Sequence, residues 1–286
     1  MNVKKIYLTA RTEYTKWILN PRMIIVAVML VFIYNLSVNP LTLMAEDMKK
    51  PLNIFEPFVA ITNSNLLIMI IPGVFLTLIS DFPKTDGSTL FFLQRTDRIN
   101  WVLGQALFVV FAIVTFISVI FVASVLPIIH IADYENSWSD VVMHYKEEFP
   151  KKSMSFGANL ITQNLTYQIS PYDTALQSTL LVMLYLFLLS LVMLMFNTMG
   201  VKIMGLVTSA GLIAIGGALC AVNTTIKWIF PMSHTIIWLH NTKFFRQPIM
   251  EMWKSYLYFG IIITVLLMLS CIFIDTTDFD SVSDID

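Results

Sequence analysis

Six long apolar runs constrain this chain more than any other feature of its sequence. They cover residues 23–38, 63–80, 101–129, 175–196, 203–222 and 254–274. A helix that crosses the hydrocarbon core of a bilayer needs about 20 apolar residues, and the first run is short for this. Only 13% of the 286 residues are charged, whereas a soluble domain carries roughly 25%. The runs therefore predict an all-α integral membrane protein whose six-span transmembrane domain occupies residues 22–274.

The segment before the first run has a different character. Residues 3–20 place apolar side chains at helical spacing, with the charged side chains mostly on the opposite side. The apolar set is Val3, Ile6, Tyr7, Ala10, Tyr14, Trp17 and Ile18. A basic face opposite Trp and Tyr suits the headgroup plane of a membrane, although a plain charged leader is the alternative. We expect residues 1–21 to form an amphipathic helix that ends at Asn20-Pro21.

The longest charged interruption between two of the runs is the stretch from Asp81 to Gln105. It combines a compact apolar patch over residues 90–93 with six charged residues, which are Asp81, Lys84, Asp86, Arg95, Asp97 and Arg98. A turn between two spans needs only polar residues. The additional apolar patch therefore predicts a short helix to which another protein binds. An amphipathic turn lying on anionic lipid would use the same residues, and that alternative stays open.

Two further interruptions are too long for simple turns. Residues 130–174 are polar and acidic, and an Asn136-Ser137 cap precedes the predicted apolar face of a helix. That face consists of Trp138, Val141, Val142, Tyr145 and Phe149. Residues 223–253 hold two short apolar pieces, broken at Pro231 and Pro248, which predict re-entrant or interfacial segments. Long loops are often functional, so residues 130–174 are a candidate for binding.

Smaller features complete the predicted organisation. Pro72-Gly73 lies inside the second run and should bend it. Residues 197–202 predict a tight turn between the fourth and fifth spans. The tail, residues 275–286, is acidic and is expected to be a separate, unstructured segment.

The orientation of the spans follows from the distribution of Lys and Arg. Six spans place both termini on one side, and the two sides hold nine cations each. Positive charges near the cytoplasmic ends of short loops decide orientation, and usually the first span dominates. Five cations precede the first span and three lie in the stretch from Asp81 to Gln105. We therefore expect the protein to lie in the cell membrane, with both termini in the cytoplasm and residues 130–174 on the extracytoplasmic side.

Several function classes lack the residues that they need. The net charge of −1 argues against a nucleic-acid partner. The sequence contains no phosphate-binding loop and no common metal or nucleophile motif, so no catalytic residue, metal or other cofactor is expected. Cys220 and Cys271 lie in apolar runs, and the four histidines are interpreted as polar surface residues. The spans hold almost no ionisable residues, which favours a conduit that draws its energy from elsewhere.

The arrangement resembles the permease subunits of bacterial type-2 ABC transporters, the ABC-2 family. The resemblance covers nearly the whole chain and rests on architecture more than on a strict motif. It rests on the segments described above and on the run Arg95-x-x-Arg98-x-x-Trp101-x-x-Gly104-Gln105, which resembles the start of the third span. Pro231-x-Ser233-His234 resembles the re-entrant region. The loop at 130–174 is longer than is usual in the family.

The resemblance implies an amphipathic elbow helix at residues 1–21 and a coupling helix within residues 81–100. It also implies two ABC ATPase subunits and a second permease, identical or different, as partners. The residues implied to dock on the ATPase are Asp86, Leu90, Phe91, Leu93, Arg95 and Arg98. Those implied to line a substrate pathway are Asn63, Asn65, Thr77, Ser80, Thr208 and Ser209. These hydroxyl and amide groups could equally satisfy backbone carbonyls within their own helices.

The sequence therefore favours a non-catalytic permease subunit of an ABC exporter, with an amphipathic peptide, drug or lipid as substrate. A non-transport scaffold or sensor that uses residues 130–174 is the alternative. A membrane-embedded enzyme is a third reading, which the lack of paired ionisable residues in the spans disfavours.

Overall fold

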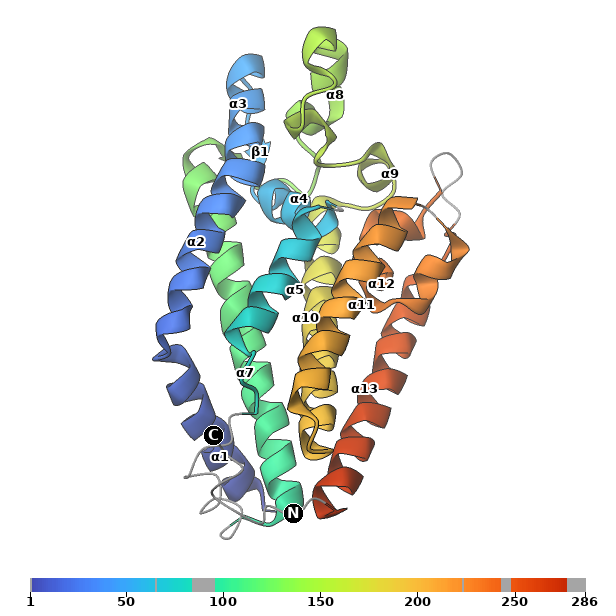
Figure 1. Ribbon diagram of the computed structural model, residues 1–286. Coiled ribbons are helices and arrows are strands. Elements are labelled where there is room, and N and C mark those ends of the chain that lie inside the picture. The colour runs from blue at the N-terminus through green and yellow to red at the C-terminus, as the bar shows by residue number, and fades with distance from the viewer. Residues whose placement is uncertain (1, 65, 84–95, 223, 243–247, 277–286) are drawn as a thin grey trace.

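The computed structural model describes residues 2–64, 66–83, 96–222, 224–242 and 248–276 and is almost entirely helical (Figure 1). Within these residues, five helices are long and apolar enough to cross a membrane: Pro21–Met48, Arg98–Ile131, Pro171–Thr198, Lys202–Val222 and Met252–Ile274. The helices α4 (Glu56–Asn63) and α5 (Leu67–Leu78) form a sixth candidate if the bent pair counts as one span. The chain is thus an all-α, multi-pass membrane protein.

The first span is longer than predicted. α2 (Ile24–Ile33), a π-helical segment over Tyr34–Val38 and α3 (Asn39–Met48) continue one another without a break. The prediction that Asn39-Pro40 ends the helix is wrong, because Pro40 falls in the first turn of α3, where its missing N–H is tolerated. At 1.5 Å per residue the 28 residues reach roughly 42 Å, so α3 extends beyond a bilayer core of about 30 Å.

The second span is broken at a different place from the one predicted. α5 runs through Pro72 as a single helix, and the sharp change of direction, 79°, lies between α4 and α5. Asn63, predicted as the start of this span, is the last residue of α4. The structure therefore moves the bend from the Pro72-Gly73 pair to the residues just before α5.

The predicted N-terminal helix is present as α1 (Val3–Ile18), which packs along the first half of α7 (Arg98–Val125). Asn2 accepts a hydrogen bond from the Lys5 N–H and caps α1. Gly104 lets the two helices approach closely, because a Cβ atom there would lie only 2.7 Å from Thr9 Cβ. The buried face of α1 carries Thr9 and Glu13 beside its apolar members, whereas Val3 and other predicted apolar-face residues are exposed.

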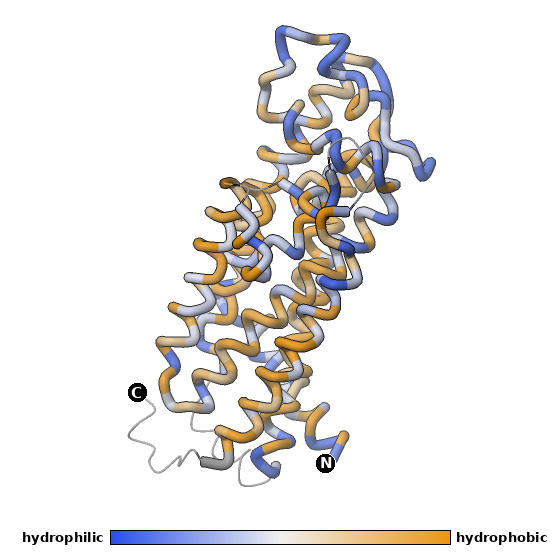
Figure 2. The backbone as a smooth tube through the Cα atoms, turned by 90° about the vertical axis from the view of Figure 1, so that its right-hand side faces the viewer, coloured by the Kyte–Doolittle hydropathy of each residue, from blue (hydrophilic) through white to orange (hydrophobic). Residues whose placement is uncertain are grey.

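α10 (Pro171–Thr198) is the central helix of the bundle. In the 18-residue apolar stretch of each helix, 61% of the residues are buried in α10 but only 17% in α13 (Met252–Thr276). α11 (Lys202–Val222) and α13 pack on it. The predicted tight turn between α10 and α11 is confirmed, and Gly200 in it has a φ of +78°. Figure 2 shows apolar residues along the bundle and hydrophilic residues concentrated at its ends.

A small head, which we define as residues 49–55 and 132–170, covers one end of the bundle (Figure 1). It contains a parallel pair, β1 (Leu52–Asn53) with β2 (Ala132–Asp133), in the register Leu52 to Ala132. The 3-10 segment Leu126–Ile131 leads from α7 into β2. The remaining elements are α8 (Asp140–Glu148), 3-10 turns at Pro150–Lys152 and Gly157–Asn159, and α9 (Gln163–Thr166).

α8 confirms the helix that was predicted in the long loop, but its cap was misplaced. Ser139, not Asn136-Ser137, caps the helix by accepting a hydrogen bond from the Val142 N–H. Val141 and Tyr145 are buried as predicted, while Trp138 precedes the helix and donates its indole N–H to the Ile169 carbonyl.

Short helical pieces follow α11, in the region where two short apolar segments broken by prolines were predicted. They are a 3-10 turn at Thr225–Ile229, α12 (Pro231–Thr235) and a 3-10 turn at Ile237–His240. Pro231 starts α12, where its missing N–H leaves no helical hydrogen bond unmade. Each piece is too short to cross a membrane.

Candidate functional site

The stretch between α5 and α7 is fastened to the first and last spans at its two ends. Arg22, at the start of the first span, forms an ion pair with Asp81 at 2.6 Å and donates to the Ser80 hydroxyl at 2.8 Å. At the other end, Arg98 donates to the Ile274 carbonyl near the end of α13, over 2.9 Å. The predicted docking residues between these anchors, Asp86, Leu90, Phe91, Leu93 and Arg95, lie outside the described residues.

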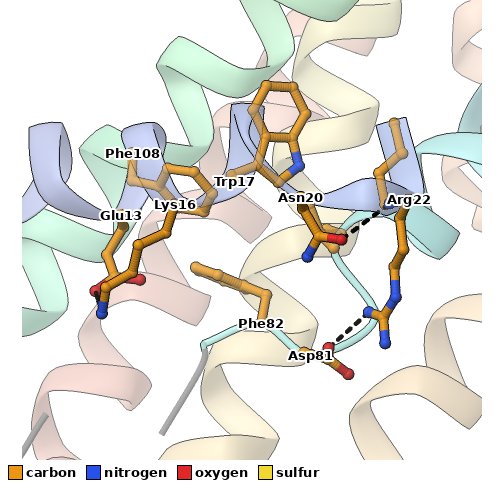
Figure 3. A pocket seen from close by; sticks show the side chains of 10 residues that line it. Glu13, Lys16, Trp17, Asn20, Arg22, Asp81, Phe82 and Phe108 are labelled. Atoms are coloured by element: carbon orange, nitrogen blue, oxygen red, sulfur yellow. Dashed lines mark hydrogen bonds and ion pairs between the residues drawn. The ribbon is translucent and has the colours of Figure 1, made fainter. Parts of the chain in front are cut away.

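A pocket lies beside the first of these anchors (Figure 3). Its volume is about 50 Å³, and its lining comes from α1, the start of the first span, the end of α5 with the residues after it, and α7. The lining residues are Glu13, Lys16, Trp17, Asn20, Arg22, Leu78, Ile79, Asp81, Phe82 and Phe108. The lining thus combines two basic side chains, two acidic side chains and three aromatic rings. The buried indole N–H of Trp17 has no hydrogen-bond partner.

Asn63, predicted to line a pathway, is fully enclosed in the bundle. Its side-chain N–H₂ donates to the Ser178 hydroxyl on α10 at 2.9 Å, and its side-chain oxygen accepts from the Ile237 N–H at 3.0 Å. Its backbone carbonyl accepts the indole N–H of Trp238 at 2.7 Å. Asn63 therefore joins the end of α4 to α10 and to the segment after α12.

The other predicted pathway residues lie apart from one another. Thr77 is exposed and donates to the Gly73 carbonyl of its own helix, and Ser80 accepts from Arg22. Ser209 is buried and donates to the Leu189 carbonyl across the α10–α11 contact, while its neighbour Thr208 is partly exposed. Asn65 lies outside the described residues. Of the described members, Asn63 and Ser209 hold helices together.

A buried histidine cluster was missed by the sequence reasoning. His234 and His240 are 2% and 1% exposed, so their interpretation as surface residues is wrong. The hydroxyl of Ser255 on α13 bridges them, at 2.8 Å from His234 Nδ1 and 2.8 Å from His240 Nε2. Trp228 packs edge-on against both rings. His234 lies in α12 and His240 in the 3-10 turn that follows, and pieces as short as these give no periodic signal in the sequence.

A second unforeseen network holds the head together. The buried carboxylate of Glu56 accepts the backbone N–H of Asn53, and the backbone N–H and hydroxyl of Ser139, at 2.7–3.0 Å. Burial, and then the hydrogen bond that Tyr145 donates to Asp47, raise the pKa of Tyr145 to about 12. The hydrogen bond to Asp140 raises the pKa of Lys50. These contacts fix α8 against α3 and α4.

In the part of the chain that the structure describes, no three His, Cys, Asp or Glu side chains are placed to hold a metal ion. No protein-family model, curated protein or solved structure matches the chain.

Proposed function

We propose that this chain is the membrane-spanning permease subunit of an ABC exporter, coupled to a separate ATPase subunit. Its substrate would be an amphipathic peptide, drug or lipid, and a second permease, identical or different, would complete the pathway. The termini would lie in the cytoplasm of a cell that carries the protein in its plasma membrane. The single observation that supports this most is the double fastening of the stretch between α5 and α7.

The two anchors would carry a force on the stretch between α5 and α7 to two different spans. A partner that pushes on residues 84–95 pulls on both neighbouring anchors, Asp81 to Arg22 and Arg98 to Ile274. The first anchor reaches the first span and the second reaches the last span. A shift of one short segment would then be passed to helices on both sides of the bundle, as coupled rigid-body motions require. α1, packed along α7, would add a lever on the third span.

The test combines purification with uncoupling variants. The tagged chain is purified from its native membranes in mild detergent, and the co-purifying ATPase is identified by mass spectrometry and assayed for ATP hydrolysis. The complex is then reconstituted with Leu90→Ala, Phe91→Ala and Arg95→Ala, alone and combined, and with Met154→Ala in the head as control, since Met154 is 94% exposed. We expect the first three to separate hydrolysis from transport and the control to change neither. Absence of any ATPase, or unchanged coupling, would refute the proposal.

Arg98 needs its own variant, because it holds α13 as well as lying in the predicted docking segment. Arg98→Ala removes a charge-assisted hydrogen bond of about 1.5–3 kcal/mol, whereas Arg98→Lys keeps the charge near the carbonyl end of α13. We expect Arg98→Ala to lower both thermal stability and coupling, and Arg98→Lys to recover most of the stability. Equal stability of all three chains would show that the anchor is not formed.

A second candidate is a non-transport scaffold or sensor that binds a partner through the head. The observation that favours it is the fixed structure of residues 130–174, which pack through Tyr145 and Lys152 on Asp47 of α3. This candidate requires that the variants at Leu90, Phe91 and Arg95 leave activity intact. The same reconstitution therefore separates the two functions.

A further inference from the structure

We propose that the pocket beside Arg22 binds the zwitterionic headgroup of an aminophospholipid, with the chemistry of phosphatidylethanolamine. This lipid would be a bound component of the protein and distinct from any transported substrate. The inference stands on the pocket alone and holds whether or not the chain works with an ATPase.

The position of the pocket places it at headgroup depth. Arg22 immediately precedes the apolar run of the first span, and cations in that position lie at the membrane–water interface. Two large apolar side chains on either side of Arg22 are strongly exposed, Leu19 at 76% and Ile24 at 71%. A lipid whose polar end enters the pocket could rest its acyl chains on these residues. A water-soluble ligand would gain nothing from them.

The hydrogen-bond donors of the pocket favour a ligand that carries phosphate oxygens. Trp17 is 7% exposed and lines the pocket, and its buried indole N–H has no hydrogen-bond partner. A buried donor without an acceptor is costly, and an acceptor that enters the pocket removes that cost. Arg22 points its guanidinium toward Asp81 in the same space, and its five N–H groups exceed the two contacts to Asp81 and Ser80 (Figure 3). Trp17 and Arg22 can therefore both donate to a phosphodiester.

The charges in the pocket call for an ammonium group as well. Glu13 and Asp81 face Lys16 and Arg22, so the four charged side chains among the described lining residues sum to zero. A neutral pocket with separated charges suits a zwitterion better than a lipid with a net negative charge. The carboxylates are hydrogen-bond acceptors, so a primary ammonium with three N–H donors fits them better than a quaternary amine that has none.

The size and the existing ion pairs agree with this ligand. The volume of about 50 Å³ exceeds the space that one water molecule needs, so the pocket can take a small polar group. The pairs Lys16–Glu13 at 3.5 Å and Arg22–Asp81 at 2.6 Å involve partly exposed cations. Such surface pairs contribute little to stability, so the Lys16–Glu13 pair can rearrange around a ligand. Arg22 can keep its contact with Asp81 and use its remaining N–H groups for the ligand.

The experiment is native mass spectrometry of the full chain in detergent, titrated with phosphatidylethanolamine, phosphatidylcholine or phosphatidylglycerol of identical acyl chains. We expect one phosphatidylethanolamine per chain, bound at least about tenfold more tightly than the other two lipids, since a charge-assisted hydrogen bond is worth about that factor or more. Trp17→Phe keeps an aromatic ring and removes the N–H, so it should cost roughly tenfold in the same affinity. Trp253→Phe, at an exposed position on α13, is the matched control and should bind as the unmodified chain does.

Two charge variants and a soluble competitor complete the experiment. Arg22→Gln and Lys16→Gln should each abolish the preference for phosphatidylethanolamine, and they serve as the test if size-exclusion chromatography shows that Trp17→Phe does not fold. Soluble phosphoethanolamine should compete only weakly, because it lacks the acyl chains. Equal binding of the three lipids, an unchanged Trp17→Phe affinity with a folded protein, or full competition by phosphoethanolamine would each overturn the proposal.

Discussion

The close approach of α1 to α7 at Gly104 gives a prediction with a calculable size. In Gly104→Ala the new Cβ would lie 2.7 Å from Thr9 Cβ and 2.9 Å from Thr9 Cγ2. Carbon atoms in contact prefer about 3.5–4.0 Å, so α1 would have to move outward by about 1 Å. Overpacking of this kind costs about 1–3 kcal/mol, while exchanging Gly for Ala within a helix returns up to about 1 kcal/mol.

A matched control separates the two contributions. Gly260 also lies within a long helix, α13, but a Cβ there would meet nothing within 4 Å. Gly260→Ala therefore reports the helix propensity alone, and the difference in unfolding free energy between the two variants should equal the overpacking cost of about 1–3 kcal/mol. Thr9→Gly removes both close atoms, so adding Gly104→Ala to that background should cost less, with a coupling energy of about 1 kcal/mol or more.

The assay is denaturant unfolding in detergent, paired with limited trypsin digestion. Trypsin can cleave α1 after Lys4, Lys5, Arg11 and Lys16 once that helix leaves α7. We expect faster cleavage at these positions in Gly104→Ala than in the unmodified chain, and unchanged cleavage in Gly260→Ala. If the two alanine variants unfold alike and are cleaved alike, the packing of α1 on α7 is not as described.

Two further predictions concern the buried networks. Ser255→Ala leaves ring nitrogens of His234 and His240 without a partner and should cost about 2–4 kcal/mol by denaturant unfolding, whereas Ser270→Ala, whose hydroxyl bonds only within α13, should cost less than about 1 kcal/mol. Glu56→Gln turns a donor toward the donors around it and should cost about 2–4 kcal/mol, with Glu46→Gln, exposed on α3, as the neutral control. Equal effects within either pair would contradict the corresponding network.

The apolar runs predicted most of the helices, because burial in lipid depends on composition over about 20 residues and needs no knowledge of neighbours. The ends of the helices followed different rules. Pro40 reads as a helix breaker when taken alone, yet the preceding π-helical segment places it in a first turn where it is tolerated. The break before α5 coincides with Asn63, whose partners lie 115 and 174 residues away in the chain.

The buried polar groups could not be inferred from local pattern for the same reason. Glu56 and Ser139 are 83 residues apart, and their contact depends on the pairing of β1 with β2. His234 and His240 were assigned to the surface because they fall outside the predicted spans, whereas in the structure both are buried and the Ser255 hydroxyl of α13 bridges them. The predicted amphipathic face of α1 missed Glu13 and Thr9, since the sequence did not reveal which side of that helix meets α7.

The two-residue pair of β1 and β2 has a mechanical consequence. It ties the chain just beyond the first span to the chain just beyond the third span, and the bonds from Glu56 to Ser139 lie next to it. Two helices that are fastened near one end separate by pivoting about that fastening. Movement between these two helices is therefore smallest at the head and grows toward their other ends, where the packing of α1 on α7 and the ion pair from Arg22 to Asp81 oppose it.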